Sequence, residues 1–306
     1  MPANKTKNKR LYLIDGYAML YRSHFALIRN PLINSKGMHT SALFGFINQI
    51  MKLINKDKPD LMVAAFDSSK KTFRHEKYPE YKATREKMPE EMVAQLPYLW
   101  KILESMGIPT LERPGFEADD IIGTLATMAA KEELDVYIVS GDKDFMQLVN
   151  DKIFLYAPSG RQADIKIYDR NGVVDKWGVP PEKIIDLLGL MGDSSDNVPG
   201  VPGVGEKTAV KLINEYGSLE ASLDHADEVK NKRAREGLQN AKSEALLSKE
   251  LVTIDTKMNL DIDFSTLKTN DIDKDSLVDI FQELEFETLQ KQILGAEGAV
   301  QKNKDV

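Results

Sequence analysis

Cysteine is absent from this chain of 306 residues, and histidine occurs only four times. The chain therefore forms no disulfide and no thiolate metal site, and the scattered histidines offer little to zinc. No apolar run reaches the roughly 20 residues that a membrane-spanning helix needs, and the basic N-terminus lacks the apolar stretch of a signal peptide. We therefore expect a cytoplasmic protein with no membrane partner, whose fold is stabilised by packing alone.

The charge distribution is more informative than the total charge. A net charge of −7 is unusual for a nucleic-acid-binding protein, because lysine and arginine make most phosphate contacts. Basic residues nevertheless cluster at Lys5 to Arg10, Lys70 to Lys87 and Lys230 to Arg235. Separate patches of opposite sign indicate a metal site beside a phosphate track, although any one basic run alone is more often solvated surface.

Short apolar runs that end in acidic residues predict buried parallel strands. They are LYLID, ending at Asp15; LMVAAFD, ending at Asp67; a weaker run at Pro109 to Glu112; and VYIVSGD, ending at Asp142. Helical patterns lie between these runs, at Ser41 to Asn55, Glu90 to Met106 and Ala118 to Ala130. Strands that alternate with helices are typical of an open α/β sheet.

The chain changes character near residue 180. Just before it, the segments IFLYAP and IKIYD predict a β-hairpin, and beyond about Gly178 the strand signals end. Helical periods follow, at Lys183 to Met191, Lys207 to Tyr216, Arg233 to Leu251 and Ser276 to Leu284. We therefore expect an α/β part over residues 11–179 and a helical part over 180–294, with a flexible basic segment at 1–10 and a flexible tail at 295–306.

Acidic residues gather at the predicted strand ends and in three short motifs. Asp15, Asp67 and Asp142 each end a strand, and parallel strands present these ends at one edge of the sheet. The motifs are FEADD with Glu117, Asp119 and Asp120, GDKDF with Asp142 and Asp144, and GDSSDN with Asp193 and Asp196. Alone, a strand-end aspartate is commonly a cap, and FEADD an acidic first turn of a helix. Together, converging carboxylates repel one another and need a cation.

The type of cation follows from the ligand chemistry. Nine carboxylates without cysteine specify hard oxygen ligation of the Mg²⁺ or Mn²⁺ type rather than zinc. In GDSSDN the two aspartates are three residues apart, about one helical turn, so we expect their oxygens on one side. Two such ions about 4 Å apart can clamp a phosphate and activate water. The sequence therefore predicts metal-assisted phosphodiester hydrolysis.

Two other interpretations of these motifs are disfavoured. GDKDF is similar to the nucleophile motif of haloacid dehalogenase phosphatases, but Met146 occupies the position where that motif has threonine or valine. The run GVPGVGEKT lacks both the GxGxxG order and the preceding strand of a dinucleotide-binding loop. It fits a helix-hairpin-helix better, in which backbone amides and Lys207 hold a phosphate. A plain Gly-Pro helix connection is the alternative.

Aromatic and basic residues alternate in the stretch TFRHEKYPEYKATREKMPEE, a pattern suited to stacking bases and holding the phosphates of a single strand. The residues concerned are Arg74, Tyr78, Tyr81, Lys82 and Arg85. On a helix, Lys82 and Arg85 would share one face, because they are three residues apart. Taken alone, this stretch is more often a solvated helix.

With these motifs in place, the chain resembles the 5′ nuclease domains of bacterial DNA polymerase I, within the flap endonuclease family. The resemblance spans roughly Leu11 to Gly295, and its most specific pieces are LIDGYAMLYR, AAFD with YKATR, GFEADDIIGTLA, VSGDKDFMQLV and LMGDSSDNVPGVPGVGEKTA. It implies a PIN-like or resolvase-like parallel-sheet nuclease core, a helical arch near residues 70–100 and a helix-hairpin-helix region with a bound K⁺.

The resemblance also implies roles for individual residues. It assigns Asp15, Asp67, Glu117, Asp119 and Asp120 mainly to one metal ion, and Asp142, Asp144, Asp193 and Asp196 mainly to the other. It gives catalytic roles to Lys82, Arg85 and Arg22, base stacking to Tyr81, and DNA contacts to Arg74, Tyr78, Gly200, Gly203, Gly205, Lys207 and Thr208.

The function implied is a 5′→3′ exonuclease and flap endonuclease in primer removal and DNA repair. Its partner would be branched or flapped duplex DNA with a 5′ single strand. We expect a monomer, linked to a polymerase if the chain is part of a longer protein. The alternatives are a DNA-binding module without catalysis and a PIN-type ribonuclease.

Overall fold

A computed structural model describes residues 8–159, 164–265, 267 and 272–298. The chain forms two compact units, and each is built from segments that are distant in sequence. The first unit comprises Met1–Phe66, Lys87–Leu111 and Asp261–Val306, and the second comprises Asp67–Glu86 and Glu112–Leu260. The expected flexible ends lie largely outside the described residues, and the expected division near residue 179 stays a prediction.

The first unit contains three parallel strands in the order β3-β2-β1. Their bounds are Arg10–Asp15 for β1, Leu61–Ala65 for β2 and Thr110–Leu111 for β3. Leu13 of β1 lies opposite Val63 of β2. Every residue of β2 is buried, as is typical of the continuous apolar runs of parallel strands. The three strands predicted in this part of the sequence are therefore confirmed.

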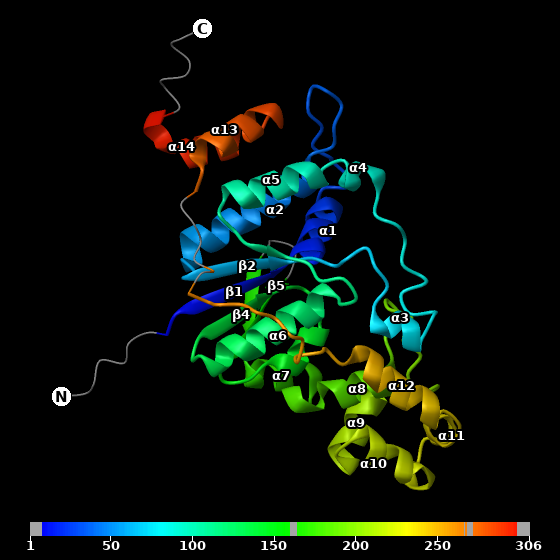
Figure 1. Ribbon diagram of the computed structural model, residues 1–306. Coiled ribbons are helices and arrows are strands. Elements are labelled where there is room, and N and C mark those ends of the chain that lie inside the picture. Colours follow the sequence, from blue (N-terminus) through cyan, green and yellow to red (C-terminus); the bar gives the residue numbers. More distant parts are fainter. Residues whose placement is uncertain (1–7, 160–163, 266, 268–271, 299–306) are drawn as a thin grey trace, which may run out of the picture. The chain divides into compact units, whose positions relative to one another are not determined.

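In the first unit, α2 and α5 lie above the strands and α13 lies beyond α5 (Figure 1). The following helices belong to this unit. They are α1 (Gly16–Ala26), α2 (Ser41–Lys52), α4 (Glu90–Val93), α5 (Leu96–Ser105), α13 (Lys274–Glu283) and α14 (Glu287–Gly298), with a π-helical turn η1 (Leu53–Asp57) after α2. The predicted helix over residues 90–106 is interrupted between α4 and α5. Pro97, in the first turn of α5, explains the break because it has no amide hydrogen to continue a helix.

The second unit contains a further strand pair and a hairpin. β4 (Asp135–Val139) runs parallel to β5 (Ile153–Ser159), and β5 pairs antiparallel with β6 (Asp164–Tyr168). Tyr156 lies opposite Ile167 across the hairpin. The predicted strand before Asp142 and the predicted hairpin are therefore confirmed.

The main regular structures of the second unit are helices, and among them α8 to α12 lie together (Figure 1). They are α3 (Phe73–Lys77), α6 (Ala118–Lys131), α7 (Arg170–Trp177), α8 (Ile184–Met191), α9 (Glu206–Tyr216), α10 (Leu219–Asp224), α11 (Lys232–Asn240) and α12 (Lys242–Val252), with short 3-10 turns η2 (Asp144–Leu148), η3 (Pro181–Lys183) and η4 (Ala226–Glu228). The predicted helix over residues 233–251 is two helices, because the backbone of Ala241 leaves the helical conformation.

β structure beyond Gly178 is limited, within the described residues, to an isolated bridge between Asp193 and Val198. This agrees with the loss of strand signals in the sequence. Among the described helices, none combines the length and the apolar character needed to cross a membrane.

Gly16 provides a test of packing in the first unit. A Cβ atom at Gly16 would lie 2.2 Å from Cε1 of Phe66, whose buried ring packs edge-on against Trp100 at 4.5 Å between centroids. Gly16→Ala should therefore lower the free energy of unfolding by about 1–3 kcal/mol, measured by urea denaturation. Gly141→Ala is the matched control, because a Cβ atom there meets nothing within 4 Å. Equal stability of the two variants would contradict the close packing at Gly16.

Candidate functional site

Eight of the nine predicted carboxylates belong to the second unit. They are Asp67, Glu117, Asp119, Asp120, Asp142, Asp144, Asp193 and Asp196. Asp15 belongs to the first unit, where it ends β1 and caps α1 by accepting a hydrogen bond of 3.2 Å from the amide of Ala18. The convergence of Asp15 with the other carboxylates stays a prediction.

The first carboxylates meet at the N-terminus of α6. Glu117 is the N-cap residue of this helix, and Oδ1 of Asp67 accepts a hydrogen bond of 2.8 Å from the amide of Ala118. The unpaired amides at a helix N-terminus favour negative charge. Asp67 and Glu117 therefore both lie at the start of α6.

Asp120, in the same turn of α6, is fully engaged within the protein. Its two oxygens accept hydrogen bonds of 2.8 Å each from the guanidinium of Arg74, and both residues are almost completely inaccessible, at 0% and 2% exposure. The amides of Asp255 and Glu117 donate to the same oxygens, at 2.9 and 3.2 Å. Four donors occupy the acceptor positions of one carboxylate, so Asp120 has none left for a metal ion. Arg74, which we expected to contact DNA, is instead an internal residue.

Tyr81, Lys82 and Arg85 surround Asp196. The hydroxyl of Tyr81 lies 3.1 Å from Oε2 of Glu117 and 3.2 Å from Oδ2 of Asp196. Nζ of Lys82 lies 2.9 Å from Oε1 of Glu117 and 3.7 Å from Oδ2 of Asp196, and Nε of Arg85 donates to Oδ1 of Asp196 at 3.1 Å. One turn of the chain therefore places two cations and a phenol among two carboxylates.

The surroundings shift the pKa values of these groups. Burial opposes the charged form of Lys82, but the attraction of Glu117 and Asp196 outweighs it and raises the pKa of the ammonium. Burial, together with the charges of Glu117 and Asp196, also raises the pKa of Tyr81, with a smaller contribution from Asp119. At neutral pH, Lys82 is therefore charged, and Tyr81 is a neutral hydrogen-bond donor.

The segment that carries these residues is not the continuous helix that we expected. The described chain is helical in α3 and again in α4, and between them Lys82 has a left-handed backbone with φ of 57°. Pro79 and Pro89 account for the interruption, because the residue before a proline avoids the helical conformation. Lys82 and Arg85 therefore do not share a helix face; a turn brings both to Asp196.

Two aromatic residues of this segment also differ in their access to solvent. Tyr81 is only 4% exposed, so its ring is not open to stack a base, contrary to our expectation. Tyr78 is half-buried, and its hydroxyl contacts Oε2 of Glu80 at 3.1 Å. Its contact with DNA stays a prediction.

A second group of carboxylates surrounds Lys143. Its ammonium contacts Oδ2 of Asp193 and lies 3.6 Å from Oδ1 of Asp144. The amide of Asp144 donates to Oδ1 of Asp142 at 2.8 Å, which fixes the two aspartates of GDKDF beside each other. We did not assign a role to Lys143 from the sequence, although its place between two predicted ligands was a signal that could have identified it.

Asp144 shows that a hard cation fits this group. Its Oδ1 atom is buried and accepts no hydrogen bond. Burial and the neighbouring charge of Asp142 raise the pKa of Asp144 to about 8, and Asp193 and Asp196 add to the effect. A divalent cation would offset these costs because it favours the ionised carboxylate. The described residues do not form a ready-made cage of three or more His, Asp or Glu side chains, since lysine and arginine nitrogens lie among the oxygens.

The loop from Asp193 to Val198 is closed by its own hydrogen bonds. The backbones of Asp193 and Val198 form a bridge, at 2.9 and 2.7 Å, and the hydroxyl of Ser195 donates to Oδ1 of Asp193 at 2.6 Å. This bridged turn replaces the helical turn that we expected. The amide of Lys82 donates to the carbonyl of Asp196 at 2.9 Å, so the loop is attached directly to the turn that carries the basic residues.

The glycines of the predicted helix-hairpin-helix differ in their surroundings. Gly200 is buried with φ of 63°, and a Cβ atom there would lie 2.4 Å from the amide nitrogen of Gly192. A Cβ atom at Gly203 would lie 2.6 Å from Cγ of Arg233. Close packing accounts for glycine at both positions, and their contact with DNA stays a prediction. Gly205 is exposed and meets nothing within 4 Å, so it alone of the three leaves room for a ligand at the start of α9.

The remaining predicted residues lie on the surface. Arg22 is exposed on α1, Lys207 is exposed in the first turn of α9, and Thr208 beside it is half-buried.

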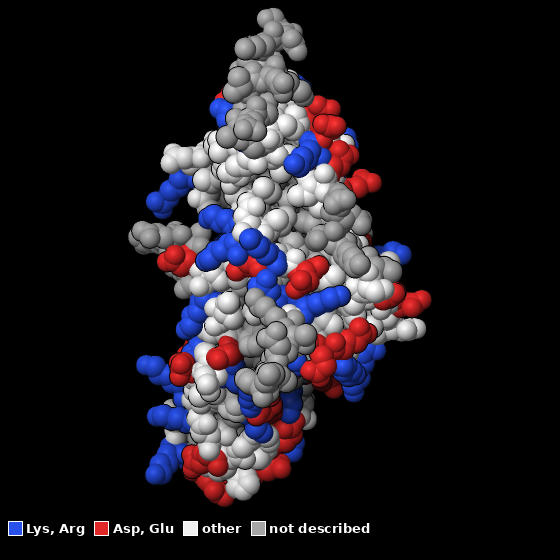
Figure 2. Space-filling model, turned by 90° about the vertical axis from the view of Figure 1, so that its left-hand side faces the viewer, with Lys and Arg blue, Asp and Glu red and all other residues white. Residues whose placement is uncertain are grey.

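On the face shown in Figure 2, lysine and arginine side chains lie among aspartate and glutamate side chains. The separate patches of opposite sign that we expected from the sequence stay a prediction.

Comparisons with known proteins agree with this architecture. DNA polymerase I of Bacillus subtilis (strain 168) is 44% identical over 289 residues, which are 94% of this chain and 32% of that protein. The chain thus spans about a third of the length of the curated relatives that it matches. Among solved structures, a phage T5 5′-exonuclease with bound zinc has a TM-score of 0.68 at 21% identity, covering 94% of this chain and 98% of the other.

A phage T5 flap endonuclease in a complex with DNA and metal ions has a TM-score of 0.67, again at 21% identity, with coverage of 94% and 98%. The model of the 5′–3′ exonuclease N-terminal resolvase-like domain matches residues 10–178, and that of the 5′–3′ exonuclease C-terminal SAM fold matches residues 179–275. These matches confirm the predicted fold class, a resolvase-like core followed by a helical region. The chain therefore belongs to the 5′–3′ exonuclease family.

Proposed function

We propose that this chain hydrolyses DNA phosphodiester bonds as a divalent-metal-dependent 5′→3′ exonuclease and flap endonuclease. The observation that carries the proposal is the gathering of carboxylates in the second unit. Four separate segments supply them, at Asp67, at the start of α6, at residues 142–144 and at residues 193–196. Lys82 and Arg85 lie among them, as a site for an anionic phosphate requires.

The carboxylates would hold two Mg²⁺ or Mn²⁺ ions. When bound, these ions would generate hydroxide from water and neutralise the leaving oxygen. We propose Asp67, Glu117 and Asp119 for one ion, and the part of Asp15, which belongs to the first unit, stays a prediction. For the other we propose the set formed by Asp142, Asp144, Asp193 and Asp196. Asp120 is left out because its acceptor positions are occupied, and the K⁺ at the helix-hairpin-helix stays a prediction.

Lys82 and Arg85 would bind the scissile phosphate. Both contact carboxylates that are proposed as ligands, so the charges that would hold a metal ion also hold these two cationic groups at the site. Arg85 is about half exposed and can turn toward a substrate, whereas Lys82 is nearly enclosed. As negative charge builds on the phosphate, these cations stabilise it.

The proposed substrate is duplex DNA with a 5′ single strand, and the proposed setting is primer removal and repair. Family membership and the DNA complex of the T5 neighbour support this proposal. The relatives are longer DNA polymerases, so we also propose that the activity operates beside a polymerase, as a monomer. A DNA-binding module without catalysis would bind a flap and leave it intact, and a PIN-type ribonuclease would cut single-stranded RNA in preference to a DNA flap.

The central test is cleavage of an end-labelled 5′-flap duplex. Because all proposed ligands are carboxylates, EDTA should abolish cleavage, and added Mg²⁺ or Mn²⁺ should restore it. Single-stranded RNA of the same sequence, under the same conditions, separates the ribonuclease alternative. Undiminished cleavage in excess chelator would overturn the metal mechanism, and binding without cleavage in Mg²⁺ would favour the inactive module.

Lys82→Ala tests the phosphate contact. It should lower the single-turnover rate by about 10² to 10³, with little change in DNA affinity, because the ammonium acts mainly on the transition state. Arg85→Ala should show a smaller defect of the same kind, since its guanidinium is more exposed. Lys70→Ala, at an exposed lysine of the same segment, is the matched control. If Lys82→Ala cuts a flap as fast as Lys70→Ala, Lys82 has no catalytic role.

Gly205→Asp tests the N-terminus of α9 as a phosphate site. Gly205 is the N-cap residue, and its open surroundings accept a side chain without a clash. Aspartate and asparagine both cap helices well, so neither variant should lose stability. Gly205→Asp should nevertheless weaken duplex binding by at least about tenfold, because its charge repels phosphate, whereas Gly205→Asn should bind as the wild type does. Equal affinity of the two variants, by fluorescence anisotropy, would favour the plain helix connection.

A further inference from the structure

Arg74 makes more contacts than its pairing with Asp120. Its Nε donates to the carbonyl of Leu251 at 2.9 Å, and one terminal nitrogen donates to the carbonyl of Thr253 at 2.8 Å. Both carbonyls lie at the C-terminal end of α12, where helix carbonyls lack partners within the helix. The planar guanidinium thus connects α3 to the start of α6 and to the end of α12.

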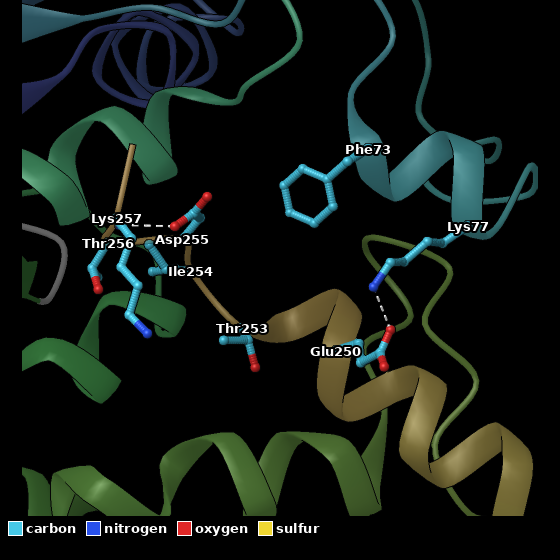
Figure 3. A pocket seen from close by; sticks show the side chains of 8 residues that line it. All are labelled: Phe73, Lys77, Glu250, Thr253, Ile254, Asp255, Thr256 and Lys257. Atoms are coloured by element: carbon cyan, nitrogen blue, oxygen red, sulfur yellow. Dashed lines mark hydrogen bonds and ion pairs between the residues drawn. The ribbon is translucent and has the colours of Figure 1, made fainter. Parts of the chain in front are cut away.

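In the described chain, one ion pair also links α3 to α12. A groove of about 470 Å³ lies beside it, lined by Phe73 and Lys77 of α3 on one side and, on the other, by Glu250 of α12 and by residues 253–257, which follow α12 (Figure 3). The pair between Lys77 and Glu250, at 2.6 Å, crosses the groove, but both side chains are about half exposed. An exposed pair of this kind contributes little stability. The buried fork of Arg74 is therefore the stronger of these two polar links.

The turn that carries Tyr81 and Lys82 follows α3 directly. It continues from α3 through two backbone hydrogen bonds, from the amide of Tyr78 to the carbonyl of Arg74 at 2.8 Å and from the amide of Tyr81 to the carbonyl of Tyr78 at 2.9 Å. These bonds join α3 to the groups that face Glu117 and Asp196.

We propose that Arg74 is a positioning residue. Its guanidinium fixes α3 to α6 and α12, and thereby sets where Tyr81 and Lys82 meet the carboxylates. Arg74 itself does not touch the substrate, because its side chain is only 2% exposed and its donors are engaged by Asp120 and the two carbonyls. The expected effect of Arg74 on cleavage rests on the proposed function. The expected effect of Arg74 on the placement of α3 is independent of that function.

Two variants of Arg74 separate geometry from charge. Arg74→Lys keeps a positive charge beside Asp120 but cannot span the carboxylate and both carbonyls, and Arg74→Gln removes the charge as well. Should Arg74→Gln fail to fold because Asp120 is left unpaired, Arg74→Lys decides the question alone. Lys77→Ala is the matched control, since it removes the exposed cation of the same helix.

The first measurement is amide hydrogen exchange of the DNA-free protein. In Arg74→Lys, exchange should become faster over residues 73–82, including the amide of Lys82 that donates to Asp196, while α9 exchanges as in the wild type. Lys77→Ala should match the wild type throughout. Wild-type exchange over residues 73–82 in Arg74→Lys would overturn the proposal, because charge alone would then suffice.

The second measurement separates rate from affinity on a 5′-flap duplex. Arg74→Lys should lower the single-turnover rate by about 10²-fold through misplaced groups, with DNA affinity and its salt dependence within about twofold of the wild type. Weaker binding and a reduced salt dependence, with unchanged exchange, would instead make Arg74 a phosphate contact and overturn the proposal. If the wild type does not cut the flap, the proposed function fails, and the exchange measurement still decides the role of Arg74.

Discussion

Repulsion among buried carboxylates is the constraint on which this site depends. Asp144 illustrates it, because burial and its acidic neighbours raise its pKa to about 8. The protein places cations among the acids to limit this cost. Lys143 lies between Asp144 and Asp193, and Lys82 lies between Glu117 and Asp196. The carboxylates make the site suited to a divalent cation, and the ammonium groups make it suited to a phosphate.

The backbone adapts to this arrangement of charge. The acidic residues come from segments that are distant in sequence, so hydrogen bonds must hold the loops that carry them in place for the side chains to meet. Two backbone hydrogen bonds between Asp193 and Val198 close one loop. The amide of Lys82 then attaches the turn that carries the basic residues to Asp196 in this loop. Lys82 accepts a left-handed backbone to do so. A strained residue held by its surroundings is a feature of functional sites more often than of plain surface.

The strand-end and helix-start positions of the carboxylates could be predicted from the sequence, whereas most of their contacts could not. An acid at the end of an apolar strand or in the first turn of a helix is placed by local structure, so its position follows from the pattern. The direction of a long basic side chain follows from packing. Arg74 and Tyr81 belong to a stretch whose composition is typical of DNA binding, yet both are buried. Arg74 contacts Glu117 and Asp120, and Tyr81 contacts Glu117.

The sequence by itself determined the strands, most of the helices, the hairpin and the identity of the acidic residues, because hydrophobic periodicity and strand-end position are local properties. Only the tertiary structure decided that Asp120 is saturated by Arg74, and that Gly200 and Gly203 are glycines for packing. The tertiary structure also has a turn between α3 and α4 where we expected a helix, and in this turn the amide of Lys82 bonds to Asp196. The reason is that hydrogen-bond saturation, close backbone approach and the closing of a turn each depend on partners far away in sequence.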